Sequence, residues 1–218
     1  MQRSARPVER VPDNPTRHAP LKARTSRDRQ RQDTFERVFE AALAEFRRVG
    51  VEKARVSDIC HAAGVAKGTF FFHFATKDDV LLERQRRISE AMAGRIEREL
   101  RHAGSASGFV EMLITIVLQE HEALGDPELV RQINLAIVRR AGSPMLGAQH
   151  TAFGTALVGQ LRRLRRAGVL RKDIDPVQLA DCLRLGFFGF LVNPQFPSES
   201  GAAGIKLLGK LLGVALAP

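Results

Sequence analysis

A short segment near residue 70 combines charged, hydroxyl and aromatic side chains at a spacing suited to binding phosphate groups. In the run AGVAKGTFFFHFATKDDV, Lys67 carries a positive charge, Gly68 allows close approach, and Thr69 adds a hydroxyl. If these residues form the first turn of a helix, its free backbone N–H groups and the positive end of its dipole also favour phosphate oxygens. His73 and Lys77 could each reach a further phosphate. The predicted chemistry is contact with the backbone of a nucleic acid.

The same segment is rich in phenylalanine, with four of the 13 in a chain that has no tyrosine or tryptophan. Read with period 2, the run TFFFHF would be a buried strand; read with period 3.6, Phe70 and Phe74 share one helical face. Nothing else in the chain alternates with period 2, and a lone strand would be marginal. We therefore predict a helix over about 66–74, with Phe70 and Phe74 in the core and Phe71 and Phe72 facing outward.

A second short helix is predicted just before this segment. Ser57 is a plausible N-cap, and Ile59, Ala62 and Ala63 form an inward stripe. Gly64 can adopt a positive φ angle and end the helix in a tight turn. The pattern predicts two short helices joined by a glycine turn.

These two helices need a longer one to pack against. Apolar residues recur at helical spacing from about Asp28, and Gly50 supplies a stop. Three helices of this kind form a helix-turn-helix, whose last helix lies in the major groove of DNA. The apolar stripe is Phe35, Val38, Phe39, Ala42, Leu43 and Phe46.

The charge of the chain is uneven. The formal net charge is +10, and residues 1–77 hold 16 Lys and Arg against 9 Asp and Glu, while the remainder holds 18 against 15. Residues 1–28 are basic and rich in proline, so we expect a flexible arm that cannot form a core. A basic arm favours a polyanionic partner, and the alternative is a solvated tail without any partner.

The quoted residues resemble a known family. The runs EAALAEFRRVG and VSDICHAAGVAKGTFFFHFATKDDVL, within about 33–82, are similar to the TetR family of bacterial transcriptional regulators, which commonly reads close to AGVSKGTLYYHFxSKExL. Weaker similarity lies in RRAGVLRKDIDPVQLA, residues 165–180. The resemblance implies an all-α fold: an N-terminal three-helix DNA-binding domain with a helix-turn-helix, followed by a C-terminal helical domain for ligand binding and dimerisation.

The resemblance and the helix geometry together give a set of expected DNA contacts. Phe71 stands where the family usually has a tyrosine whose hydroxyl meets a phosphate, and losing one such bond would weaken binding by about 1 kcal/mol. Ala66 replaces a common serine N-cap at a cost of about 1 kcal/mol or less. The basic arm could compensate by adding salt-sensitive affinity. The expected contact residues are Ser57, Ala66, Lys67, Gly68, Thr69, Phe71, Phe72, His73 and Lys77.

The rest of the chain also reads as helical. Thr76 and Asp79 have capping-box spacing at the start of a long helix that reaches about His102. We expect three parts: a flexible arm over 1–28, a DNA-binding domain over 29–76, and an effector-binding and dimerisation domain over 77–218. Turn signals separate further predicted helices at about 108–124, 127–141, 145–167, 176–192 and 201–216.

The helices near 176–192 and 201–216 are apolar over more of their circumference than one core face requires. We therefore expect a homodimer formed through them, with burial inside one subunit as the alternative. The resemblance also implies a small-molecule effector in a cavity between the middle helices, although the sequence does not identify it. Its possible lining residues, each of which could instead be ordinary core, are Met112, Ile116, Phe153 and Leu157.

Other classes of protein are disfavoured. We find no catalytic grouping, phosphate-binding loop, cofactor motif or metal set, and Cys60 and Cys182 have no Cys or His at ligand spacing. The longest apolar run, LGFFGFLV, is too short to span a membrane, so we expect a cytoplasmic protein. The predicted function is a sequence-specific regulator, with a repressor released from a palindromic operator by an effector as the leading form. The alternative is a non-specific, nucleoid-type DNA-binding protein.

Overall fold

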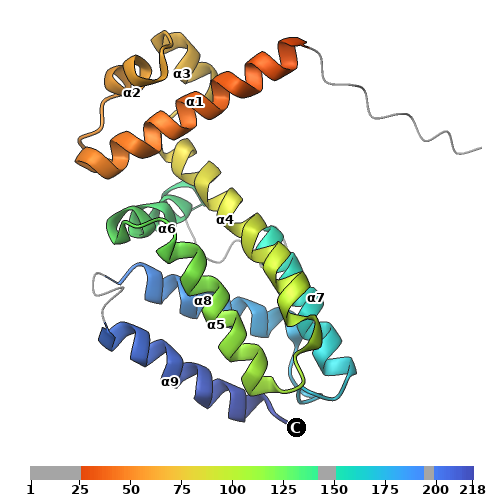
Figure 1. Ribbon diagram of the computed structural model, residues 1–218. Coiled ribbons are helices and arrows are strands. Elements are labelled where there is room, and N and C mark those ends of the chain that lie inside the picture. Colours follow the sequence, from red (N-terminus) through yellow and green to blue (C-terminus); the bar gives the residue numbers. More distant parts are fainter. Residues whose placement is uncertain (1–25, 142–150, 194–198) are drawn as a thin grey trace, which may run out of the picture.

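The computed structural model describes residues 26–141, 151–193 and 199–218 of the chain, and these residues form helices without any strand (Figure 1). Residues 1–25 of the predicted arm lie outside the described residues. The described elements are α1 Ser26–Val49, α2 Val56–Ala63, α3 Lys67–His73, α4 Lys77–Glu99, the 3-10 turn η1 Leu100–His102, α5 Ala106–Glu122, α6 Pro127–Ala141, α7 Ala152–Arg166, α8 Pro176–Leu191 and α9 Glu199–Leu216.

Helices α1, α2 and α3 form a compact unit at one end of the molecule (Figure 1). The predicted stripe of α1 is confirmed, because Val38, Phe39 and Phe46 are all buried. The arm prediction was wrong for residues 26–28, which belong to the first turn of α1. Asp28 lies in that turn, where a carboxylate favours the positive end of the helix dipole.

The turn between α2 and α3 follows the prediction. Gly64 has φ 64° and ψ 41°, the left-handed conformation that glycine adopts without strain. The N–H of Val65 donates to the carbonyl of Cys60 at 3.0 Å, which closes the end of α2. The sharp turn thus places α3 directly after α2.

Two details of α2 differ from the prediction. The helix begins at Val56, with Arg55 as an N-cap that makes no side-chain bond, so Ser57 is not the cap. The buried positions are Ile59, Cys60 and Ala63, whereas Ala62 is exposed. The 3.6-residue repeat brings position 60, and not position 62, onto the face that meets α1.

The phenylalanine-rich segment is a helix, as predicted. Phe70 is fully buried and Phe74 is 3% exposed, whereas Phe71 and Phe72 are 54% and 63% exposed. Phe74 packs against α1, with its ring centroid 4.9 Å from that of Phe35. The helix ends one residue earlier than predicted, since Phe74 is the C-cap.

Helix α4 connects this unit to the other helices (Figure 1). Thr76 is its N-cap, and the predicted capping box with Asp79 is complete, with both reciprocal bonds present. Helix α4 packs against α5, α6 and α7, while α7 meets α8 and α5 meets α9. Among the described helices, none combines the length and the apolar character that a membrane span requires.

Several helix boundaries differ from the predictions because side chains cap them elsewhere. Ser105 caps α5 by accepting from the N–H of Gly108, so α5 begins at Ala106 and not at 108. Thr151 caps α7 by accepting from Gly154, so α7 begins at Ala152. Residues 145–150 of the predicted helix lie outside the described residues.

Helices α5 and α9 approach closely because α9 carries glycine at the contact. A Cβ atom on Gly213 would lie 2.6 Å from the Cα of Ser107. A Cβ on Gly209 would meet Cδ1 at the end of the Ile114 side chain. The backbone of Ser107 cannot move as easily as the end of the Ile114 side chain, so Gly213 is the position where the close approach of the two helices requires glycine.

Candidate nucleic-acid interface

The first turn of α3 forms an open surface. Lys67 and Gly68 are exposed, and a Cβ atom added to Gly68 would meet nothing within 4 Å. Thr69 is partly exposed. Ala66 is the N-cap, as predicted, and makes no side-chain bond to the first-turn N–H groups. This helix end therefore presents backbone donors, a hydroxyl and an ammonium group on one accessible face.

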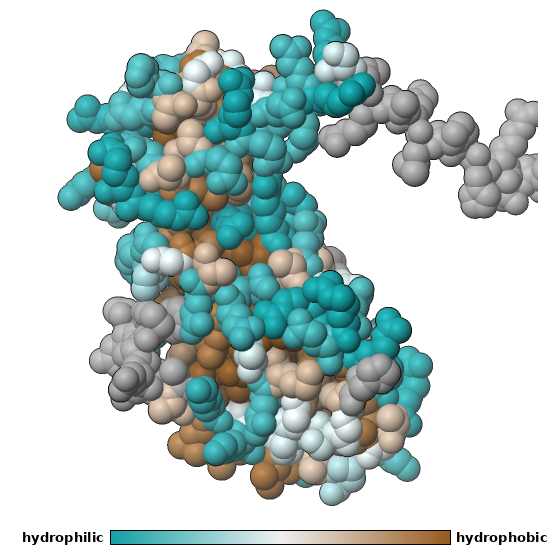
Figure 2. Space-filling model, viewed as in Figure 1, coloured by the Kyte–Doolittle hydropathy of each residue, from teal (hydrophilic) through white to brown (hydrophobic). Residues whose placement is uncertain are grey.

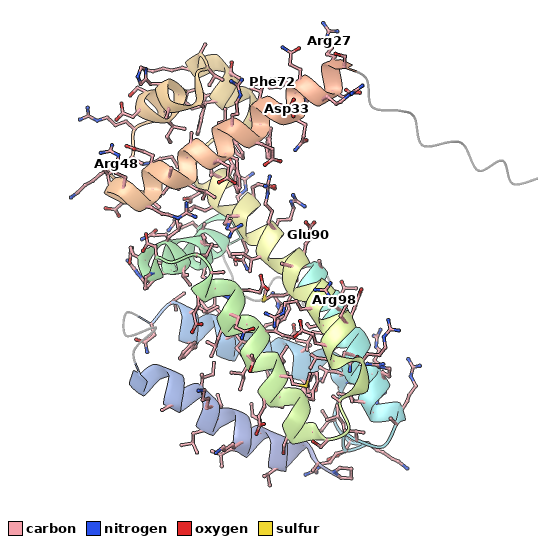
Figure 3. The ribbon with its side chains drawn as sticks, viewed as in Figure 1. Arg27, Asp33, Arg48, Phe72, Glu90 and Arg98 are labelled. Carbon is pink, nitrogen blue, oxygen red and sulfur yellow. The ribbon has the colours of Figure 1, made fainter. Side chains whose placement is uncertain are left out.

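The outer face of α3 continues into α1 through an aromatic contact. The guanidinium carbon of Arg31 lies 4.9 Å from the ring centroid of Phe72. Figure 3 shows Phe72 where α3 approaches the first half of α1. The contact extends the cationic surface from α3 to α1. Arg31 is not among the contacts predicted from the sequence, although its i, i+4 spacing to Phe35 places both residues on one face of α1.

His73 lies between two aromatic rings. Its ring centroid is 5.0 Å from that of Phe72 and 5.5 Å from that of Phe35, both edge-on. Burial, and then the charge of Arg31, lower the pKa of His73 below its ordinary value. The imidazole is therefore neutral near pH 7, and could offer a phosphate a hydrogen bond but no full charge.

Lys77 has a different role from the predicted phosphate contact. Its ammonium group donates to the backbone carbonyls of Val51, Glu52 and Ala54 at 2.6, 3.0 and 3.2 Å. An ammonium has three N–H donors, so these bonds use its full capacity. Lys77 thus fixes the α1–α2 connection to the start of α4, and we leave it out of the proposed DNA contacts.

The acidic residues beside Lys77 are also matched by other partners. Arg139 makes a two-pronged ion pair with Asp78, at 2.7 and 2.8 Å. Arg140 lies 3.5 Å from Asp79. These pairs tie the end of α6 to the first turn of α4, so the unit that carries α3 is fixed to the remaining helices.

Ser57 is exposed in the first turn of α2, and its hydroxyl donates to Asp58 at 3.2 Å. Arg55, which precedes the helix, is exposed as well. Arg55 was not predicted to lie at the start of α2, because the helix was expected to begin after Ser57.

A cavity of about 70 Å³ lies among α4, α5, α6, α7 and α8, and we call it the central cavity. Of the residues predicted to line an effector site, Phe153 lines this cavity. Ile116 and Leu157 are instead buried in the core, and Met112 is 37% exposed on α5. The residues lining the central cavity are Gln85, Met92, Val117, His121, Asn134, Ile137, Phe153, Arg184, Phe187, Phe188 and Leu191.

Helices α8 and α9 leave apolar side chains in solvent. Leu207, Leu211 and Val214 follow one another at helical spacing on α9 and are 60%, 61% and 75% exposed. Leu185 on α8 and Leu208 on α9 are also exposed. Figure 2 shows apolar atoms gathered at the end of the molecule where α9 lies in Figure 1. We call these five residues the apolar face.

Three packed helices with an exposed third helix define the class of this protein: it carries a DNA-binding helix-turn-helix on an all-α body. Residues 38–83 match a family model described as bacterial regulatory proteins, tetR family. Residues 38–83 therefore form a DNA-binding domain of the TetR family type, and the relatives that match more of the chain are transcriptional regulators.

The comparison with individual proteins covers most of the chain. This chain is 26% identical over 161 residues to the fatty acid metabolism regulator protein of Bacillus subtilis, and the match spans 70% of this chain and 78% of that protein. It is 23% identical over 163 residues to the transcriptional regulator UidR of Escherichia coli K12, spanning 74% and 82%. The structure of Thermus thermophilus FadR, a TetR family transcriptional repressor in complex with lauroyl-CoA, shares the fold with a TM-score of 0.61, 23% identity, and coverage of 82% and 90%.

Proposed function

We propose that this protein is a homodimeric, cytoplasmic repressor, and not an enzyme. It binds a palindromic operator through α3 and leaves it when a small-molecule effector binds among the C-terminal helices. The observation that carries the proposal is the division of α3 into two faces. Phe70 anchors the helix in the core, while Lys67, Gly68, Phe71 and Phe72 stand in solvent.

The proposed contacts divide by chemistry. Lys67, the Thr69 hydroxyl and the first-turn N–H groups hold phosphates and fix the position of α3 on the duplex. Phe71 and Phe72 meet sugars or thymine methyl groups in the major groove. Ser57, Ala66, Gly68 and His73 complete the contact surface, and the basic residues 1–25 add affinity that depends on salt. The domain division is that given by the sequence, with the arm shortened to residues 1–25.

The proposed dimer forms through the apolar face. One α3 reads only a few base pairs, so discrimination needs two copies held about one DNA turn apart, or a multiple of it. Five exposed apolar side chains on α8 and α9 are more than a solvated surface favours. Leu211→Glu should give a monomer in light scattering. Lys206→Glu, on the same helix and exposed, should remain a dimer; a dimer in both variants would contradict this interface.

The proposed effector site is the central cavity. It borders α4, which begins next to the three-helix unit, so a ligand that prefers one position of α4 would change the placement of α3. The relatives named for fatty acid metabolism or solved with lauroyl-CoA support small-molecule control in general.

Selection of bound fragments from random duplex DNA tests the proposal. We expect the selected fragments to share an inverted repeat and to bind on the order of a thousandfold more tightly than unrelated DNA. Equal affinity for all duplexes would favour the nucleoid-type alternative. Absence of any duplex binding at low salt would reject the DNA-binding role of α3.

A further inference from the structure

The central cavity contains hydrogen-bond acceptors without a partner. Nε2 of His121 and Oε1 of Gln85 are both shielded from solvent, and neither meets a donor in the described part of the chain. His121 is only 2% exposed. A buried polar atom without a hydrogen-bond partner destabilises the fold. Two such atoms at one cavity are therefore suited to a ligand that supplies the missing hydrogen bonds.

The chemical character of His121 follows from its other ring nitrogen. Nδ1 lies 2.7 Å from the carbonyl oxygen of Val117. A carbonyl only accepts, so the hydrogen of the ring sits on Nδ1. Burial lowers the pKa of His121, although the Val117 bond and Glu120 act in the opposite direction. The ring is therefore neutral, and Nε2 presents a lone pair that needs a donor.

The other polar residues that line the cavity have partners within the protein, so they do not indicate a charged ligand. Arg184 has a carboxylate nearby, with Asp181 at 3.4 Å. The amide nitrogen of Asn134 donates to the carbonyl of Val130 at 2.9 Å. The remaining walls are mainly apolar and include three aromatic rings, Phe153, Phe187 and Phe188. A flat, neutral, mainly apolar molecule fits these walls.

We infer that the effector is a small hydroxylated aromatic molecule, a phenol or diphenol. One hydroxyl donates to Nε2 of His121, a second hydroxyl donates to Oε1 of Gln85, and the ring packs among the phenylalanines. This inference rests on the proposed function, because it names the chemical class that controls the same regulator.

The size of the cavity indicates how such a ligand would act. At about 70 Å³ it is smaller than the cavity of roughly 150 Å³ that accommodates benzene in a protein core. A phenol therefore binds a conformation in which the surrounding helices have moved apart. Because α4 is one of these helices, occupancy and the position of the three-helix unit are linked.

Binding of two matched probes to the full-length protein tests the inference. Resorcinol carries two hydroxyls, and 1,3-dimethoxybenzene replaces both with methyl ethers that cannot donate. The chain has no tyrosine or tryptophan, so the fluorescence of the probe can be followed with little background from the protein. We expect resorcinol to bind at least about tenfold more tightly than the ether. His121→Leu should remove this preference, and Thr115→Val, at an exposed site on the same helix, should keep it.

Each outcome has a separate meaning. Equal binding of both probes, or no binding of either, by wild-type protein would overturn the inference even if the variant failed to fold. Binding of lauroyl-CoA in place of resorcinol would also overturn it. The proposed function is judged independently by operator binding without any probe. If the protein binds the operator but not resorcinol, the inferred effector class is wrong and the proposed DNA-binding function is kept. If the protein binds resorcinol but no DNA, the ligand class is supported and the proposed DNA-binding function is rejected.

Discussion

The guanidinium of Arg87 on α4 lies over the ring of Phe39 on α1, with its central carbon 4.2 Å from the ring centroid. The same group pairs with Glu36 on α1 and with Glu83 on α4, each at 2.8 Å. A planar cation thus joins two helices by stacking and by ion pairs together. This contact fixes the three-helix unit to the first half of α4.

Replacing this cation should weaken the junction. Arg87→Lys keeps the charge but loses the planar stack, so we expect the free energy of unfolding to fall by about 1 kcal/mol, and the melting temperature by about 2–4 °C. Differential scanning calorimetry measures both. Arg131→Lys, which affects an ion pair within α6 and no ring, should change stability by less than about 0.5 kcal/mol. Equal losses would show that the stacking adds nothing.

Lys67 should contribute one phosphate contact. In Lys67→Ala, the slope of log K against log salt concentration should decrease by about 0.9, and affinity should fall for all sequences alike. A salt titration with the selected operator and with unrelated DNA measures this slope. Lys172→Ala, at an exposed site far along the chain, serves as the control. An unchanged slope in the Lys67 variant would remove this residue from the interface.

Phe71 offers a test by gain of function. Phe71→Tyr restores the hydroxyl that the family usually places there, so operator affinity should rise about fivefold, equivalent to about 1 kcal/mol. The new residue would be the single tyrosine of the chain, and quenching of its fluorescence would report its approach to DNA. Phe72→Tyr, on the ring covered by Arg31, is the matched comparison. Unaltered affinity and fluorescence on adding operator would place residue 71 away from the duplex.

The close packing of α5 and α9 predicts opposite effects at two glycines. Gly213→Ala would bring a methyl group against the backbone of Ser107, so stability should fall by about 1–3 kcal/mol. Gly204→Ala, on the same helix with nothing nearby, should raise stability by up to about 1 kcal/mol. Urea unfolding followed by circular dichroism measures both. Two variants of like stability would mean that the helices can move apart without cost.

His121 should make stability depend on pH. Burial lowers its pKa in the folded state, so the unfolded state binds the proton more readily. The stabilising contribution is complete above the ordinary value of 6.5 and is lost as the pH falls below it. Between pH 7.5 and 5.5, wild type should lose more stability than His121→Asn, by at most about 1.4 kcal/mol per pH unit.

A second histidine must be separated from this effect. The pKa of His73 is lowered too, so His73→Asn should be titrated beside the first variant. Arg84 and Glu120 are the charges near His121, and both are present in wild type and in His121→Asn. Parallel pH profiles for wild type and His121→Asn would show that His121 is not held neutral by the fold.

The local features of the three-helix unit could be predicted from the sequence. The period of the phenylalanines separated the buried Phe70 from the exposed Phe72, and Gly64 marked the turn, because both depend on residues a few positions apart. The role of Lys77 could not be predicted, since its three carbonyl partners lie 23 to 26 residues earlier in the chain. The positive charge of Lys77 by itself is equally compatible with a phosphate oxygen and with a backbone carbonyl oxygen as its partner.

The central cavity shows the same limit. Of the four residues predicted to line an effector site, Phe153 borders this cavity and the other three do not, because a cavity depends on how five helices cross and not on any one repeat. A local signal for His121 did exist: it follows Val117 by four residues, on the otherwise apolar buried face of α5. A polar residue in such a position would have indicated either a bonded core group or a ligand contact.

The three hydrogen bonds from Lys77 to the α1–α2 connection make the first turn of α4 and the three-helix unit move together. With 23 residues, α4 is about 34 Å long. It therefore acts as a lever arm: a tilt of about 5° at its far end sweeps the opposite end through about 3 Å, close to the rise of one base pair. In the proposed dimer, a shift of this size at each α3 would be enough to put the two helices out of register with the proposed operator.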